Sequence, residues 1–219
     1  MSIHTTPPKP FAPIRSMGPG HRERMVRHLV ALSPEDRYLR FGYPAGDPQI
    51  RQYVTGLNFE RDDVFGIFNR RLELLAVAHL AYSSSPDCAS CAEFGVSVSA
   101  HARGRGYGKR LFERAVMHAR NQGVEMMFIH ALSENTVMLS IAAQAGSRLV
   151  RDGSETEAFL RLPPANFDTL VSELVQEQLA QTDYRWKAQL QAFRQLLGGA
   201  EAAASPVTTR ERSEAHTDA

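Results

Sequence analysis

The chain lacks an excess of charge of either sign, and it lacks any long hydrophobic run. Its 219 residues contain 25 Lys and Arg against 24 Asp and Glu, for a net charge of +1. Proteins that wrap nucleic acid need clustered excess cations, so this balance argues against such a partner. No apolar run approaches the roughly 20 residues that span a bilayer, and the polar segment from Met1 to Pro10 lacks the apolar core of a signal peptide. We therefore expect a cytoplasmic protein with neither a nucleic-acid nor a membrane partner.

Cysteine is scarce as well, because the chain has two, Cys88 and Cys91, spaced as Cys-x-x-Cys. This spacing occurs in redox pairs and in halves of zinc sites. A tetrahedral zinc site needs about two more ligands, and no nearby pair of His or Cys residues supplies them. The pattern favours two free thiols in a turn between strands over a redox pair, and it predicts no metal site.

Composition divides the chain into four parts. Residues 1–10 read as a flexible, proline-rich lead, and residues 11–162 as one folded domain of ordinary size. A proline pair then opens a helical extension over residues 163–199. Residues 200–219 are small and polar, and we expect them to be disordered.

Hydrophobic periodicity predicts an α+β domain. Helical spacing or start signals mark residues 21–32, 33–41, 47–57, 107–122 and 133–145. Short runs rich in β-branched and aromatic residues predict strands at residues 11–17, 64–68, 72–82, 94–98, 124–132, 147–151 and 156–162. A helix crossover between two neighbouring strands requires a parallel pair, while the remaining strands read as an antiparallel meander. We expect a three-layer fold, in which a mixed, mostly antiparallel sheet carries helices on both faces.

The C-terminal extension has an apolar stripe at helical spacing. Asn166 can cap the helix, and Gly198-Gly199 are expected to end it. The stripe contains Phe167, Leu170, Val171, Leu174 and Val175, and continues with weaker spacing through Leu179, Trp186, Leu190, Phe193 and Leu197. The favoured interpretation is a helix packed on the chain's own sheet. The alternative is a surface for a partner or for a second copy of the chain.

A glycine-rich turn between a predicted strand and a predicted helix carries the strongest functional signal. The run from Val98 to Arg110 reads VSAHARGRGYGKR. Glycines here let the backbone approach a ligand, and the helix N-terminus offers free N–H groups and partial positive charge to a phosphate. Cations crowd the first turn, where the helix dipole prefers acids. A bound polyanion explains this arrangement, whereas a solvated basic surface is the alternative.

Two common phosphate motifs do not fit this turn. A P-loop needs Ser or Thr after its Gly-Lys pair, but Arg110 follows Lys109. The dinucleotide fingerprint would place its third glycine at Lys109. The pattern that fits is Arg-x-x-Gly-x-Gly, formed by Arg103, Gly106 and Gly108, which resembles the acyl-CoA pyrophosphate loop of the GNAT acetyltransferase superfamily. The resemblance covers about residues 11–162, and the segment from Leu32 to Phe41 also looks like the acceptor-side helices of bacterial protein-lysine acetyltransferases.

The resemblance implies an acyl-CoA site, with acetyl-CoA as co-substrate. The pantetheine arm would pair with the backbone of Val96 and Val98, and the Val98 N–H would polarise the thioester carbonyl. Such a donor is worth about 3 kcal/mol of the barrier. The residues that the resemblance assigns to the coenzyme are Val96, Val98, Arg103, Gly104, Arg105, Gly106, Tyr107, Gly108, Lys109 and Asn135. The alternative role of Asn135, which is compatible with binding, is to cap the helix that follows it.

An amine acceptor must lose a proton before it attacks, because a primary alkyl amine has a pKa of about 10.4. Glu93, on the strand before the glycine-rich turn, is the candidate general base. The alternative is a strand-edge carboxylate that faces solvent or forms an ion pair. His130 is a weaker candidate. The family's usual acid, a Tyr four residues before the helix-ending Gly146, is replaced by Ala142, and Ser147 replaces the aromatic residue that follows that glycine.

Three functions are therefore compatible with the sequence. The first is an acyl-CoA-dependent N-acyltransferase that acetylates a primary amine, such as a protein lysine, a protein N-terminus, a polyamine or an amino sugar. The second is a CoA-binding, GNAT-like regulatory module with little turnover, which the missing tyrosine favours. The third is an interaction protein built around the C-terminal helix, which would also support a homodimer.

Overall fold

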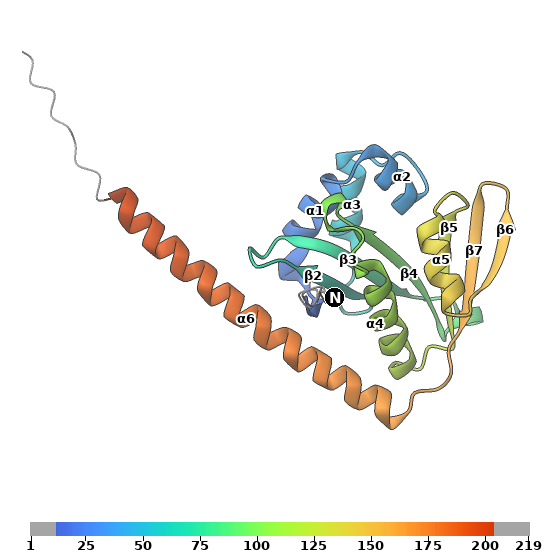
Figure 1. The fold of residues 1–219 in the computed structure, drawn as a ribbon. Coiled ribbons are helices and arrows are strands. Elements are labelled where there is room, and N and C mark those ends of the chain that lie inside the picture. Colours follow the sequence, from blue (N-terminus) through green and yellow to red (C-terminus); the bar gives the residue numbers. More distant parts are fainter. Residues whose placement is uncertain (1–11, 204–219) are drawn as a thin grey trace, which may run out of the picture.

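A mixed sheet of seven strands forms the centre of the molecule (Figure 1). The computed structural model describes residues 12–203, apart from the side chains of Asp87, Phe167, Trp186 and residues 190–203. The predicted flexible lead, and the predicted disordered tail from residue 204 on, lie outside the described residues. The spatial order is β1-β2-β3-β4-β5-β7-β6, and the strands are β1 (Ile14–Met17), β2 (Asp63–Phe68), β3 (Leu74–Tyr82), β4 (Cys91–Val98), β5 (Met126–Leu132), β6 (Arg148–Asp152) and β7 (Glu155–Arg161).

Helices cover both faces of this sheet, which confirms the predicted three-layer α+β fold. One face packs against α1 (Arg22–Val30), α2 (Pro34–Phe41) and α3 (Asp47–Gly56), and the other against α4 (Tyr107–Asn121) and α5 (Thr136–Gln144). Two clusters of buried apolar side chains fill the two interfaces. The long α6 (Phe167–Ala203) then runs along α4 and β1 (Figure 1).

The pairing of β4 with β5 is parallel and short, whereas every other neighbouring pair is antiparallel. It joins Cys91–Glu93 to Met126–Phe128 and goes no further. Both strands continue beyond that point, β4 to Val98 and β5 to Leu132. The centre of the sheet is therefore forked.

Local capping explains where several helices begin and end. The Ser33 hydroxyl accepts a hydrogen bond from the Asp36 N–H (3.1 Å) and starts α2, as the sequence predicts. The helix expected from residue 133 begins only at Thr136, because the Asn135 side chain caps it by accepting the Met138 N–H (3.2 Å). Gly123 and Gly146 have φ values of +78° and +87°, in the left-handed region that ends α4 and α5.

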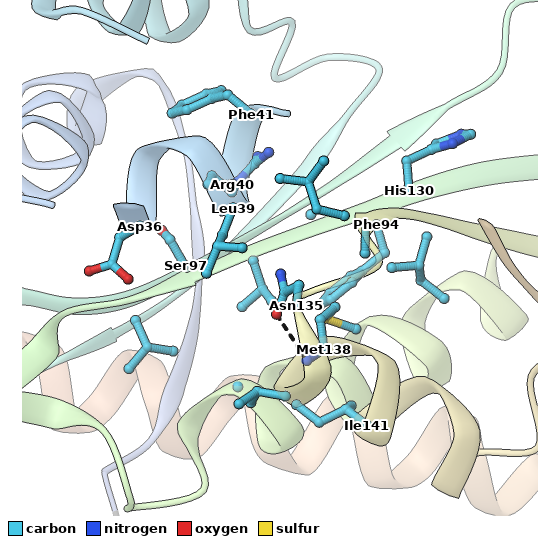
Figure 2. Close-up of a pocket in the computed structure, with 18 of the residues that line it drawn as sticks. Asp36, Leu39, Arg40, Phe41, Phe94, Ser97, His130, Asn135, Met138 and Ile141 are labelled. Carbon is cyan, nitrogen blue, oxygen red and sulfur yellow. Dashed lines mark hydrogen bonds between the residues drawn. The ribbon is translucent and has the colours of Figure 1, made fainter. Parts of the chain in front are cut away.

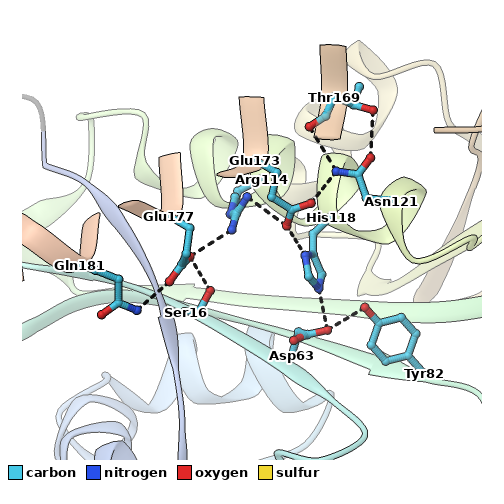
Figure 3. A network of polar contacts seen from close by, with 10 residues as sticks. All are labelled: Ser16, Asp63, Tyr82, Arg114, His118, Asn121, Thr169, Glu173, Glu177 and Gln181. Atoms are coloured by element: carbon cyan, nitrogen blue, oxygen red, sulfur yellow. Dashed lines mark hydrogen bonds and ion pairs between the residues drawn. The ribbon is translucent and has the colours of Figure 1, made fainter. Parts of the chain in front are cut away.

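A polar network holds the first part of α6 to the domain (Figure 3), while Ala180 and Tyr184 pack against it further along the helix. Arg114 of α4 is buried, and its Nη1 and Nη2 lie 3.1 Å and 3.2 Å from carboxylate oxygens of Glu173 and Glu177. His118, one turn further along α4, bridges Glu173 and Asp63 of β2. Burial disfavours the charged imidazole, but hydrogen bonds to Asp63 and Glu173 outweigh it and raise the pKa of His118 to about 9. We name Asp63, Arg114, His118, Glu173 and Glu177 the anchor network.

The expected helix does pack on the chain's own sheet, through β1, but the prediction that its apolar stripe makes this contact is wrong. Leu170, Val171, Leu174, Val175 and Leu179 are 42% to 62% exposed. The anchor network turns the opposite face of α6 inward, because the cations that it pairs lie on α4. Phe167, Trp186, Leu190, Phe193 and Leu197 are also part of the predicted stripe, and their side chains lie outside the described part of the chain.

The end of α6 also differs from the prediction. The helix continues through Gly198-Gly199 to Ala203. Glycine costs only about 1 kcal/mol per residue in a helix, and the alanine-rich residues that follow favour its continuation.

Cys88 and Cys91 are joined by a disulfide, so the expected free thiols are wrong. The bond links the one-turn helix Pro86–Cys88 to the first residue of β4. Among residues 12–203, no helix is both long and apolar enough to cross a membrane.

Candidate active site

A cleft of about 850 Å³ opens at the fork between β4 and β5 (Figure 2). Its walls are the separated strands, residues 93–98 and 129–132. The end of α2 and the start of α5 close it on two sides, and the glycine-rich turn before α4 closes a third. The cleft therefore joins every segment for which the sequence predicts a coenzyme contact.

The backbone of β4 offers unused hydrogen-bonding groups to this cleft. The Ser99 N–H donates to Leu75 O and the Ser83 N–H to Cys91 O, both at 2.9 Å. In an antiparallel ladder, alternate residues point their N–H and C=O groups at the same neighbour. The odd-numbered residues of β4 thus bond β3, and the even-numbered Val96 and Val98 direct theirs into the fork.

The glycine-rich turn has the geometry of an anion site. Gly104 and Gly106 adopt φ values of +71° and +75°, and α4 begins directly afterwards at Tyr107. A Cβ on either glycine would meet no protein atom within 4 Å, so the space above the turn is open. The first N–H groups of α4 have no partner within the helix and face this space. A diphosphate fits the turn on these grounds.

The cations of the turn are not all directed into the cleft. Lys109 lines it, with Nζ 3.4 Å from Gln144 Oε1. Arg103 lines it too, but it forms an ion pair with Asp36 of α2. Arg105 does not line the cleft and instead points Nη2 at His101 O (3.5 Å). Arg110 lies outside the cleft as well, and donates to Ala12 O (2.6 Å).

The remaining predicted coenzyme residues all line the cleft. Tyr107 is buried at the start of α4, and Gly108 lies against Val98 and Ile141. Asn135 lines it from the start of α5 while it caps that helix (Figure 2). Ala142, which stands where relatives often have tyrosine, is completely buried in the core between α5 and the sheet.

Glu93 stands at the point of the fork, since it is the last residue of β4 that pairs with β5. Its side chain is exposed and lines the cleft. No cation of the described residues lies within ion-pair distance, so the ion-pair alternative for Glu93 is not seen there. His130 lines the opposite wall, and its Nδ1 lies 3.4 Å from Glu157 Oε1.

Arg40 is a cleft residue that the sequence did not single out. The last turn of α2 carries its guanidinium over Gly95 of β4, where an added Cβ would lie 2.8 Å from Nη2. Its Nη2 donates to Tyr53 Oη (2.8 Å), and Tyr53 Oη lies 2.9 Å from His79 Nδ1. No sequence spacing connects α2, α3 and β3, so only the folded chain could reveal this cluster.

Ser97 and His28 form a second unpredicted pair. His28 Nε2 lies 2.9 Å from Ser97 Oγ, and its Nδ1 lies 3.0 Å from Leu74 O. Burial lowers the pKa of His28 to about 4. The imidazole is therefore neutral near pH 7 and too weak a base to activate the hydroxyl, so the pair orders β4 against α1.

A forked β4–β5 pair beside a glycine-rich turn and a helix N-terminus defines an acyl-CoA N-acyltransferase fold. The model of the acetyltransferase (GNAT) family matches residues 33–146, more than half of the chain. The chain belongs to this family.

Solved structures with the same fold share little sequence with this chain. The GNAT domain of S. lividans PAT is 21% identical, with a TM-score of 0.59 over 68% of this chain and 89% of that one. An N-acetyltransferase from Staphylococcus aureus Mu50 is 13% identical, with a TM-score of 0.56, and the match covers 70% of this chain and 99% of that one. A ribosomal-protein-alanine N-acetyltransferase from Brucella melitensis is 13% identical, with a TM-score of 0.53 over 68% and 99%. No curated protein matches the chain.

Proposed function

We propose that the chain is an N-acyltransferase that moves an acetyl group from acetyl-CoA to a primary amine by direct attack. The observation that carries this proposal is the pair of unused backbone positions in the fork, Val96 and Val98, in line with the open turn at Gly104 and Gly106. The pantetheine arm of coenzyme A has amide groups that can pair with these two backbone positions, and the diphosphate of the coenzyme can bind at the turn.

Each part of the cleft then has a role. The diphosphate binds the N–H groups from Gly104 to Lys109, and the pantetheine amides bond the backbone of Val96 and Val98. The Val98 N–H donates to the thioester oxygen, where negative charge develops in the tetrahedral transition state. Asn135 and Tyr107 complete the walls around the coenzyme.

Glu93 acts as the general base. The ammonium group of the acceptor first loses a proton to the Glu93 carboxylate, directly or through water. The neutral nitrogen then attacks the thioester carbon, the C–N bond forms, and the nitrogen releases its second proton to water. The C–S bond then breaks, and the CoA sulfur leaves as a thiolate. A thiol pKa of about 8.5 makes this leaving group tolerable without an acid, which fits the burial of Ala142.

The acceptor that we propose is a protein lysine, a protein N-terminus or a small amine. Among the similar structures, one is described as a ribosomal-protein-alanine N-acetyltransferase and one as a PAT GNAT domain. We further propose a cytoplasmic location. Disulfides are rare in the cytosol except in redox-active pairs, so the Cys88–Cys91 bond would be reversible there.

A thiol-release assay tests the enzymatic proposal. Acetyl-CoA is supplied with a panel of amines to the wild type, to Glu93→Gln, and to Glu125→Gln as a control that removes an exposed carboxylate outside the cleft. We expect amine-dependent release, with kcat on the order of a hundred-fold lower in Glu93→Gln alone.

A CoA-binding regulatory module is the second candidate, favoured by the absence of a tyrosine at position 142. Calorimetry separates the two: binding of acetyl-CoA without amine-dependent thiol release would support the module and contradict the enzyme. Failure to bind acetyl-CoA would contradict both.

We also propose that α6 forms a homodimer through its exposed stripe. A stripe on one helix is self-complementary about a two-fold axis. Exposed charge changes from Asp168 near the start of α6 to Arg185 further on, so antiparallel copies bring opposite charges together. Leu174→Lys should yield a monomer by light scattering, whereas Gln178→Lys, at another exposed position on the helix, should not. A wild type that is already monomeric at high concentration contradicts the dimer.

A further inference from the structure

The guanidinium of Arg40 lies flat on β4, inside the cleft and close to the candidate base. Gly95 makes this contact geometrically feasible, because any Cβ there would sit within 3.0 Å of Nη1, Nη2 and Cζ. Gly95 is two residues from Glu93, so both side-chain positions lie on the same face of the strand, about 7 Å apart. Arg40 and Glu93 therefore stand side by side at the acceptor end of the fork (Figure 2 shows Arg40).

Among the residues that the structure describes, Arg40 has no carboxylate partner, unlike two arginines near it. Arg37, on the same helix, lies 2.9 Å from Asp47, and Arg103 pairs with Asp36. Within residues 12–203, no acidic side chain lies at salt-bridge distance from Arg40. Its Cζ lies 5.1 Å and 5.4 Å from the ring centroids of Phe41 and Tyr53, but these contacts supply no carboxylate, so the half-buried cation can accept an anionic ligand.

A chain of neutral groups behind Arg40 fixes its orientation. Burial and the charge of Arg40 lower the pKa of His79, which is therefore neutral near pH 7. Its Nε2 lies 3.4 Å from Asp62, so its Nδ1 accepts the hydrogen of Tyr53, whose oxygen in turn accepts from Arg40 Nη2. Tyr53 and His79 thus direct their donors away from the cleft, and in the part of the chain that the structure describes the other N–H groups of Arg40 have no hydrogen-bond acceptor.

We propose that Arg40 binds a carboxylate of the acceptor, so that the acceptor is a primary amine with a carboxylate nearby. The inference rests on the proposed function. Glu93 faces the amine end, and the guanidinium takes the carboxylate through paired, charge-assisted hydrogen bonds. A free α-amino acid and a peptide lysine beside an acidic residue both present this chemistry, whereas a polyamine is repelled by Arg40.

Matched acceptors test the proposal. The first pair is an α-amino acid and its amide, and the second is a lysine peptide with Glu or Gln beside the lysine. For each pair, thiol release gives the ratio of kcat/KM with and without the carboxylate. We expect a ratio of about ten or more for the wild type in at least one pair. The pair that shows it distinguishes the free amino acid from the peptide.

Variants then assign the preference to Arg40. Arg40→Gln should bring the ratio close to one, Arg40→Lys should leave an intermediate ratio, and Arg51→Gln, which removes an exposed cation from α3, should retain the wild-type ratio. Calorimetric titration of the same acceptors into the protein saturated with CoA gives a readout that does not depend on turnover. If Arg40→Gln fails to fold, Arg40→Lys carries the test.

The outcomes separate this inference from the proposed function. Thiol release that does not depend on added amine would contradict the proposed acetyltransferase activity. Release at equal rates for both members of each pair, or a preference that survives in Arg40→Gln, overturns the role of Arg40 and leaves the acetyltransferase standing.

Discussion

Arg114 and Arg40 are two guanidinium groups in different settings within one domain. Arg114 is buried on α4 and has carboxylates of Glu173 and Glu177 within 3.2 Å (Figure 3). Arg40 is half-buried on α2, and the polar partner it has is the Tyr53 hydroxyl. The charges of the anchor network are paired with one another, whereas Arg40 and Glu93 have no ion-pair partner within residues 12–203.

The comparison distinguishes charged side chains that stabilise the fold from charged side chains that are available to a ligand. A paired, buried cation stabilises the docking of α6, and its removal leaves two carboxylates without a positive partner. An unpaired cation beside an open cleft contributes little to folding and is available to a ligand. Substitutions in the anchor network should therefore change stability, and substitutions in the cleft should change binding.

The largest effect should follow from Arg114→Met. This change leaves Glu173 and Glu177 without their cation, and we expect about 3 kcal/mol of lost stability in urea unfolding. Arg40→Gln loses one hydrogen bond and should cost about 1 kcal/mol. Equal losses for the two variants would contradict the comparison.

The pH dependence of stability should report His118. In the folded protein its pKa of about 9 exceeds the usual 6.5. Its contribution to the free energy of unfolding is therefore complete below about pH 6.5 and is lost as the pH rises through 9. The shift corresponds to about 3 kcal/mol. Asp63 and Glu173 act in the opposite direction: although burial raises a carboxyl pKa, hydrogen bonds from His118 hold both below their usual range. The contribution of these two carboxylates to stability is lost only when the pH falls far enough to protonate them.

Urea unfolding at pH 6 and pH 9.5 measures this loss. His118→Gln should flatten the alkaline part of the profile, while His101→Gln, at an exposed histidine, should leave it unchanged. If stability still falls at alkaline pH in His118→Gln, the loss of stability comes from another group.

Gly106→Ala should separate strain from ligand contact. Gly106 and Gly123 have φ values of +75° and +78° at the two ends of α4, and a Cβ at either would meet nothing within 4 Å. Alanine should cost about 1 kcal/mol of stability at both positions. Only Gly106→Ala should also weaken acetyl-CoA binding, by about ten-fold in calorimetry, because Gly106 lines the cleft and Gly123 does not. Equal affinities of the two variants for acetyl-CoA would contradict the proposal that this turn binds the coenzyme.

The smallest effect should come from Asp36→Asn, and its sign is unusual. This change releases Arg103 from its ion pair and lets the guanidinium turn toward the diphosphate. Exposed pairs are worth about 0.2–1 kcal/mol, so acetyl-CoA affinity should rise by up to about five-fold. Glu35→Gln, at the exposed neighbouring position, should leave the affinity unchanged. A lower affinity in Asp36→Asn would mean that Arg103 does not bind the coenzyme.

The sequence predicted local structure and the residues that line one side of the cleft. Ser33, Asn135 and Gly123 act over one helical turn, so the caps and ends that they set can be read from neighbouring residues. The glycine-rich turn is likewise contiguous from residue 103 to 108. The family's pattern therefore located the residues that line this side of the cleft, apart from Arg105.

The failures involve contacts between distant segments. Periodicity found the apolar stripe of α6 but could not tell which face turns inward, because Arg114 and His118 lie about 60 residues before their partners Glu173 and Glu177. The cluster of Arg40, Tyr53 and His79 joins three elements and leaves no periodic trace. Arg103 was predicted from its place in the motif, but its ion pair with Asp36 depends on how α2 crosses the cleft.

A crystal structure with acetyl-CoA would show where the coenzyme binds. We expect the diphosphate to lie against the N–H groups of residues 104–109, and the pantetheine amides to bond Val96 and Val98 in the fork between β4 and β5. A coenzyme bound elsewhere, with the fork closed or filled by side chains, would contradict the proposed coenzyme site.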